Sequence, residues 1–291
     1  MSLGEKRVGQ ASPLQKTFDI LMPFFVYFLV HDLAQVILIV LFNASLEVFG
    51  ENYTNFMQTH SMTVNGVLNA LALLLGMTAV LPMALKEFQG ASRQLREEGV
   101  CKLPKLHTLA AGPKIVAYGL LLLWAVALAM GMNLLLACTG LTAASPQYTE
   151  VANRQYGVAL GMGIVLYGVI SPLAEEVVFR GLIYNRMKRY FMIPLAIVVC
   201  GVLFGFYHGN IVQGIYGCVL GIAITFAYEW YGSFLAPVLF HGAANICVFV
   251  VSYDTAFYDS VSSPILCLIS MAVSLLCLGV IVRMRKIQRN K

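Results

Sequence analysis

Eight long apolar runs constrain this chain more than any other feature of its sequence. A bilayer offers the backbone no hydrogen-bond partners, so a run of about 20 apolar residues crosses it as an α-helix. Only 11% of the 291 residues are charged, whereas roughly a quarter are charged in soluble domains. The sequence therefore predicts an all-α membrane protein with eight transmembrane helices. The runs are residues 18–42, 62–85, 114–138, 156–180, 193–209, 211–229, 233–251 and 262–282.

The basic residues predict how the chain is oriented. All but two of the 19 Lys and Arg residues flank the runs on one side, and the exceptions are Arg154 and Arg180. Because Lys and Arg accumulate in cytoplasmic loops, both termini are expected in the cytoplasm. The membrane is the plasma membrane if the source is bacterial. The net charge of +5 then reflects topology, and no nucleic-acid partner is expected.

The chain is expected to divide near residue 150. Residues 1–150 carry three runs and a cytoplasmic connector, residues 86–113, that can start with an amphipathic surface helix. Residues 151–291 carry the remaining five runs, and their fourth to seventh helices are expected to form a compact functional bundle. Glycines four apart predict close helix packing there. The pairs are Gly157/Gly161, Gly201/Gly205 and Gly217/Gly221.

The first run carries three polar residues, His31, Asp32 and Gln35. A charged side chain is costly in hydrocarbon, so Asp32 is not expected to face lipid. We interpret the group as a polar contact inside the helix bundle. A role in substrate passage or proton movement is the alternative.

Residues 171–181, S-P-L-A-E-E-V-V-F-R-G, place Glu175, Glu176 and Arg180 in another apolar segment. Ionisable groups at such a position indicate a functional site. Glu176 and Arg180 lie four apart on one helical face and can pair. Glu175 is rotated by about 100° from Glu176 on a helix and is available for chemistry.

Two later runs add histidines and an amide. His208 follows Phe204 by four residues, and His241 precedes Asn245 by four. A carboxylate and a histidine can activate water, while a second histidine and an amide can donate hydrogen bonds to a developing oxyanion. The set is typical of a peptide-bond hydrolase. Zinc bound by Glu175, His208 and His241 is the alternative use of the same residues.

The three motifs E-E-x-x-x-R, F-x-x-x-H and H-x-x-x-N, in this order, resemble those of the CPBP intramembrane proteases. This family includes type II CAAX prenyl endopeptidases and bacteriocin-processing or immunity (Abi-like) proteins. The resemblance covers roughly residues 156–250. It implies an eight-helix fold with a conical catalytic bundle of helices 4–7, and a glutamic endopeptidase without a cofactor rather than a metalloprotease.

The resemblance also implies a role for each matching residue. Glu175 resembles the glutamate that activates water together with His208. His241 and Asn245 match the pair assigned to the oxyanion hole. Glu176 and Arg180 match the supporting pair, and Phe204 belongs to the histidine motif. The implied substrate is a membrane-associated protein or peptide, either a prenylated CAAX protein or a bacterial peptide.

Helix geometry sets a condition on this site. At 1.5 Å per residue, Glu175 lies about 16 Å from Arg186 and His208 about 22 Å from Ile193. These residues meet only if the fifth helix begins beyond the membrane surface or the fourth helix is strongly tilted, and we predict the former. We therefore expect residues 186–192 to form a cytoplasmic turn, and the chamber to open towards the cytoplasm.

Two other function classes stay open at the level of sequence. A non-catalytic immunity or scaffold protein would bind a peptide toxin or a sensor through the same polar cluster. A transporter is disfavoured, because the chain shows no internal repeat.

Overall fold

The computed structural model describes residues 12–97 and 111–289, and in these two segments every regular element is a helix. Seven helical stretches there are long and apolar enough to cross a membrane. The chain is thus an integral multi-pass membrane protein. The stretches are Pro13–Val48, Ser61–Gln89, Lys114–Cys138, Leu160–Met187, Ile211–Tyr231, Leu235–Tyr253 and Pro264–Met284.

The predicted fifth span is the shortest of the apolar helices. Helix α10 (Ile193–Tyr207) has 15 residues, which at 1.5 Å per residue is about 22 Å, less than the roughly 30 Å of a hydrocarbon core. Seven of the eight predicted spans are therefore confirmed as long apolar helices. The count of eight stays a prediction.

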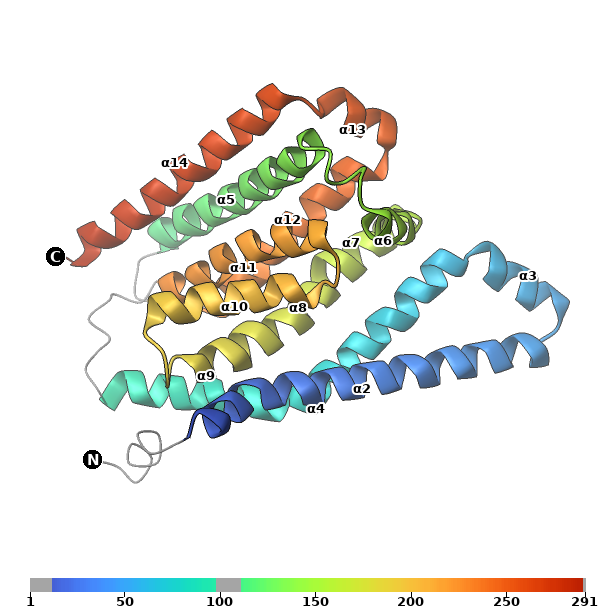
Figure 1. The fold of residues 1–291 in the computed structure, drawn as a ribbon, viewed down its shortest axis with the longest axis horizontal. Helices are drawn as coiled ribbons and strands as arrows, with labels where there is room; N and C mark the ends of the chain where they lie inside the picture. The colour runs from blue at the N-terminus through green and yellow to red at the C-terminus, as the bar shows by residue number, and fades with distance from the viewer. Residues whose placement is uncertain (1–11, 98–110, 290–291) are drawn as a thin grey trace.

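The long helices pack as antiparallel pairs around the centre of the molecule (Figure 1). Helix α2 (Pro13–Val48) pairs with α4 (Ser61–Glu97), and α10 pairs with α11 (Ile211–Tyr231). Helix α5 (Ala111–Cys138) lies between α14 (Pro264–Arg289) and α12 (Leu235–Tyr253).

Short helices mark the two ends of the molecule. Helix α9 (Asn185–Met187) lies at the end where both termini are found (Figure 1). Helices α3 (Glu51–Thr59), α6 (Pro146–Tyr156) and α13 (Thr255–Val261) lie at the opposite end. The segment that joins the first two spans is therefore largely helical.

The helix that carries the two glutamates contains two π-helical segments. It runs through α7 (Leu160–Val165), the π-helix η2 (Leu166–Ile170), α8 (Ser171–Glu176) and the π-helix η3 (Val177–Tyr184) into α9. The expected single span at residues 156–180 is wrong in its bounds, because α6 ends at Tyr156 and the spanning stretch is Leu160–Met187. The predicted turn is shorter than expected, since helix continues to Met187.

Pro172 explains the first change of register. Proline has no N–H and its ring clashes with the carbonyl four residues earlier, so it cannot sit in an unbroken α-helix. The Ser171 N–H, directly before it, bonds the Leu166 carbonyl five residues back, in the π register. Single π turns of this kind occur frequently at functional sites.

Glycines bring α10 and α11 into backbone contact. A Cβ on Gly201 would lie 2.5 Å from the backbone of Ile222, and one on Gly221 would lie 2.8 Å from the Gly201 carbonyl oxygen. The packing predicted for these glycines is confirmed. The prediction for Gly161 is wrong, because a Cβ there would meet no atom within 4 Å.

Ion pairs close the end of the bundle near α9. Arg186 bonds the Glu87 carboxylate at 3.1 Å and the Asp19 backbone carbonyl at 2.6 Å. Arg189 also pairs with Glu87, and the Tyr190 hydroxyl donates to Asp19 at 2.9 Å. This network joins α2 and α4 to the segment after the glutamates.

The polar group of the first span does not lie where it was expected. His31 Nδ1 lies 2.8 Å from Asp32 Oδ1, but 62% of the Asp32 side chain is exposed on the surface of α2. The prediction of a contact inside the bundle is therefore wrong for Asp32. Much of the predicted connector, residues 98–110, lies outside the described residues.

Candidate active site

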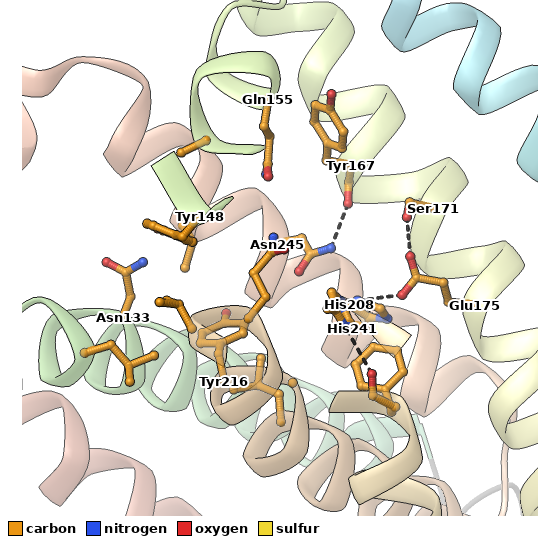
Figure 2. Close-up of a pocket in the computed structure, with 18 of the residues that line it drawn as sticks. Asn133, Tyr148, Gln155, Tyr167, Ser171, Glu175, His208, Tyr216, His241 and Asn245 are labelled. Carbon is orange, nitrogen blue, oxygen red and sulfur yellow. Dashed lines mark hydrogen bonds and ion pairs between the residues drawn. The ribbon is translucent and has the colours of Figure 1, made fainter. Parts of the chain in front are cut away.

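One internal cavity brings together the residues that the sequence singled out. Glu175, Phe204, His208, His241 and Asn245 all line it, although they come from α8, α10 and α12 and the turn after α10 (Figure 2). Its volume is about 220 Å³, which is several times the roughly 30 Å³ that one water occupies in the liquid. The cavity therefore has room for a water and part of a substrate.

Glu175 is nearly buried and faces this cavity. Its Oε1 accepts a hydrogen bond from the Ser171 hydroxyl, one helical turn earlier. Its Oε2 lies 3.8 Å from His241 Nε2, beyond direct hydrogen-bond distance. Sequence reasoning missed Ser171, although its spacing of four from Glu175 was a usable signal. One carboxylate oxygen is thus fixed and the other faces the imidazole.

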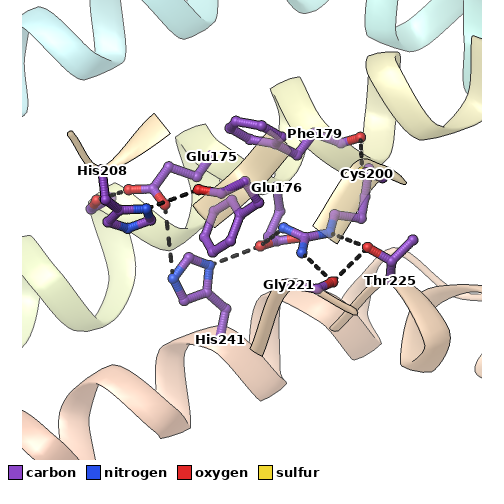
Figure 3. Close-up of polar contacts among 11 residues, drawn as sticks. Glu175, Glu176, Phe179, Cys200, His208, Gly221, Thr225 and His241 are labelled. Carbon is purple, nitrogen blue, oxygen red and sulfur yellow. Dashed lines mark hydrogen bonds and ion pairs between the residues drawn. The ribbon is translucent and has the colours of Figure 1, made fainter. Parts of the chain in front are cut away.

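Glu176 points the other way, into a fully buried network (Figure 3). Arg180 Nη1 donates to Glu176 Oε1 at 2.7 Å, which confirms the predicted pair. The other guanidinium nitrogens donate to Thr225 Oγ1 at 3.2 Å and the Gly221 carbonyl at 2.9 Å. These bonds satisfy a cation that would otherwise be costly to bury.

His241 connects the two glutamates. Its Nδ1 lies 2.8 Å from Glu176 Oε1, which already accepts from Arg180. A carboxylate can only accept, so the proton of His241 lies on Nδ1 and Nε2 is turned towards Glu175. Glu176 therefore fixes the orientation of the imidazole next to Glu175.

His208 lies at the end of α10 with its ring also fixed through Nδ1. That atom bonds the Phe204 carbonyl at 2.9 Å, and since a carbonyl only accepts, Nε2 of the neutral ring is left as the acceptor. The Phe204 ring lies edge-on to both His208 and His241 and packs against the Arg180 guanidinium, whose Cζ is 4.7 Å from the ring centroid. Phe204 thus separates the buried charge from the cavity.

Asn245 has a structural task that the sequence did not reveal. Its Nδ2 donates to the Tyr167 carbonyl at 3.0 Å. That carbonyl lacks its ordinary helical donor, because the Ser171 N–H bonds Leu166 and Pro172 has no N–H. The Asn245 amide therefore satisfies a backbone acceptor that the π turn leaves free. Its second N–H and its oxygen are available on the cavity side.

The zinc alternative does not fit this arrangement. Across the described ranges, no three His, Cys, Asp or Glu side chains gather closely enough to hold a metal ion. Nδ1 of both histidines is engaged, by Glu176 and by the Phe204 carbonyl, so Nε2 is the ring nitrogen of each that is left to bind a metal. No chemical step is therefore routed through a metal at Glu175, His208 and His241.

The cavity extends from Glu175 away from residues 186–192. From Glu175 it continues past Asn245 to Asn133 on α5 and to Tyr148 and Gln155 on α6 (Figure 2). Helix α6 lies at the end of the molecule away from both termini and α9 (Figure 1). The ion pairs of Arg186 and Arg189 occupy the end next to residues 186–192. The opening of the chamber towards the cytoplasm stays a prediction.

Fold and site together define a multi-pass membrane protein with a buried glutamate, two histidines and an amide in one cavity. Residues 158–247, which include all of these groups, match the family described as type II CAAX prenyl endopeptidase Rce1-like. A Bacillus subtilis (strain 168) protein named "Putative membrane peptidase YdiL" is 24% identical over 161 residues, which are 52% of this chain. Both matches support a likeness of this part of the chain to the CPBP family.

The extent of these matches is limited. The alignment with the Bacillus subtilis protein covers 64% of that protein's length, less than two thirds. No solved structure matches this chain. The family match agrees with the resemblance seen over residues 156–250.

Proposed function

We propose that this protein is an intramembrane endopeptidase that cleaves a membrane-associated protein or peptide with a water molecule activated by glutamate. The observation that carries the proposal is the convergence of Glu175, His208, His241 and Asn245 on one cavity among buried helices. The family match over the same residues supports it. The proposal includes a metal-free mechanism.

The contacts suggest how the reaction proceeds. Glu175 Oε2 accepts a proton from a water that is also hydrogen-bonded to Nε2 of His208. The hydroxide attacks the peptide carbonyl carbon. The oxyanion receives hydrogen bonds from the imidazolium form of His241, which carries a second proton on Nε2 while its Nδ1–H stays bonded to Glu176, and from the second N–H of Asn245. Collapse of the intermediate breaks the C–N bond, and Glu175 returns the proton to the leaving amine. Glu176 and Arg180 hold His241 in place.

The wider architecture is part of the proposal. We place α10 as the eighth span. The conical catalytic bundle consists of the segment α7–α9 and the helices α10, α11 and α12. The two regions of the chain are residues 1–150 and 151–291. Both termini are proposed to be cytoplasmic, because the basic residues gather at their end. The cavity then extends towards the non-cytoplasmic side.

Purified protein in lipid nanodiscs provides the test. Glu175→Ala and His208→Ala should abolish cleavage of a reporter substrate, while insertion and abundance stay unchanged. His60 offers a matched control, because its Nδ1 also bonds the carbonyl of a Phe four residues earlier, at 2.9 Å, but the residue is exposed far from the cavity. His60→Ala should cleave normally. Full cleavage by either site variant contradicts the proposal, whereas a native protein that binds the reporter but does not cleave it favours a non-catalytic binding protein.

Chelation separates the two hydrolytic mechanisms. Incubation with EDTA should leave the rate unchanged, because Glu175 and the histidines act without a metal. A loss of cleavage that added zinc restores would instead favour a metalloprotease.

A further inference from the structure

The half of the cavity beyond Asn245 has its own lining and is not needed for the chemistry. Figure 2 shows Glu175, His208 and His241 at one side of the view, with Asn133 and Tyr148 at the other and Asn245 and Tyr216 between them. The far wall combines the end of α5, the start of α11 and one face of α6. A substrate at Glu175 that is long enough to pass Asn245 would meet this wall.

Helix α6 turns an uncharged face to the cavity. Its lining residues lie at spacings of four, seven and eight, which places them on one side of a helix. They are Tyr148, Ala152, Gln155 and Tyr156. The two charged residues of α6, Glu150 and Arg154, are exposed and pair with each other at 2.5 Å. The amphipathic pattern of this short helix thus keeps charge out of the cavity.

The amide side chains of the far wall are oriented as donors. Asn133 Oδ1 accepts from the Tyr258 hydroxyl at 3.0 Å, and the Gln213 Oε1 accepts from Asn210 at 2.5 Å. Both oxygens are engaged in these contacts, so the N–H groups of Asn133 and Gln213 are the polar atoms left to face a ligand. Such donors are complementary to peptide carbonyl oxygens.

Beyond Asn245, the lining residues include none that would balance a charge on the substrate. The residues that border the cavity include no Lys or Arg, and Glu175 is the one carboxylate among them. The two histidines, His208 and His241, lie on the side of Glu175. Burial raises the pKa of Tyr148 and Tyr156 above the ordinary value of 10.0, so both phenols stay neutral. A substrate carboxylate or ammonium here would be buried without a partner, which is costly.

We propose that the α6 side of the cavity is a substrate-binding subsite that takes an uncharged, extended peptide segment next to the scissile bond. The inference rests on the proposed peptidase function and deepens it. Amide donors bind the backbone carbonyls of this segment, and the neutral wall excludes Lys, Arg, Asp, Glu and a free C-terminal carboxylate. The enzyme is then selective for a cleavage site inside a neutral stretch.

Internally quenched peptides test the subsite on the full chain in nanodiscs. The parent peptide has five uncharged residues on each side of the cleaved bond, and each derivative carries one Lys or one Glu at a flanking position on either side. The native protein should cleave the parent at least about tenfold faster, by kcat/KM, than the derivatives charged on the side that binds along α6. Equal rates for neutral and charged peptides would overturn the subsite.

A charge exchange sharpens the test. Gln155→Glu should raise the relative kcat/KM for Lys-bearing peptides about tenfold, because the new carboxylate balances the ammonium. Glu150→Gln on the outer face of α6 is the control and should change nothing. An unchanged preference in Gln155→Glu contradicts the proposal.

The two proposals fail in different ways. Cleavage that depends on Glu175 but ignores the charge of the peptide refutes the subsite alone. Absence of Glu175-dependent cleavage for every peptide, the parent included, refutes the proposed function and the subsite with it.

Discussion

Glu175 and Glu176 are neighbours in the chain, yet they occupy two different regions. Glu176 is fully buried, and its Oε1 accepts from both Arg180 and His241. Glu175 faces a cavity and has Ser171 as its hydroxyl donor. A step of about 100° around the helix separates them. Glu176 therefore stabilises the site, while Glu175 is placed to react.

The largest effect is expected on thermal stability, when the buried ion pair of Glu176 and Arg180 is broken. Arg180→Leu leaves the carboxylate of Glu176 without its cation, and loss of one partner of a buried ion pair costs about 3–5 kcal/mol. The melting temperature of the purified protein should fall sharply. Arg154→Leu is the matched control, because Arg154 forms an ion pair of the same spacing with Glu150 at the exposed surface. Similar melting temperatures for both variants would contradict a stabilising role for the buried pair.

Asn245 bonds the Tyr167 carbonyl and is also proposed to bind the oxyanion, and these two roles can be separated. Asn245→Ala should destabilise the protein by about 1–3 kcal/mol, because the Tyr167 carbonyl loses its donor, and should also abolish cleavage. Pro172→Ala restores a backbone N–H near that carbonyl. The double variant should therefore recover thermal stability without recovering cleavage. Recovery of both would show that Asn245 is only structural.

The smallest effect is expected on kcat, when Glu175 loses the hydrogen bond from Ser171. Ser171→Ala removes the hydroxyl that fixes Glu175 Oε1, so kcat should fall by about tenfold or less while KM and melting temperature stay close to the native values. Ser171→Thr keeps the hydroxyl and should restore most of the rate. A change in KM alone would instead place Ser171 in substrate binding.

Much of the framework could be predicted because it depends on local pattern. Run length identified the seven long apolar helices, and spacing alone identified the pair of Glu176 and Arg180. The π turns could not be located in the same way. The effect of the first one, η2, depends on where Pro172 falls relative to the Tyr167 carbonyl, which accepts from the distant side chain of Asn245.

Features that depend on packing were also missed. Asp32 was expected inside the bundle, but nothing in its local sequence reveals that it lies on the outer face of α2. The direction of the chamber was inferred from distances along straight helices. That inference could not include the ion pairs that close one end or the α6 wall at the other.

The difference between the two glutamates is tested most directly by measuring cleavage and melting temperature together for Glu175→Gln and Glu176→Gln. The account predicts that Glu175→Gln melts as the native protein does but does not cleave, whereas Glu176→Gln melts at a clearly lower temperature. Cleavage by Glu175→Gln at the native rate would contradict the account.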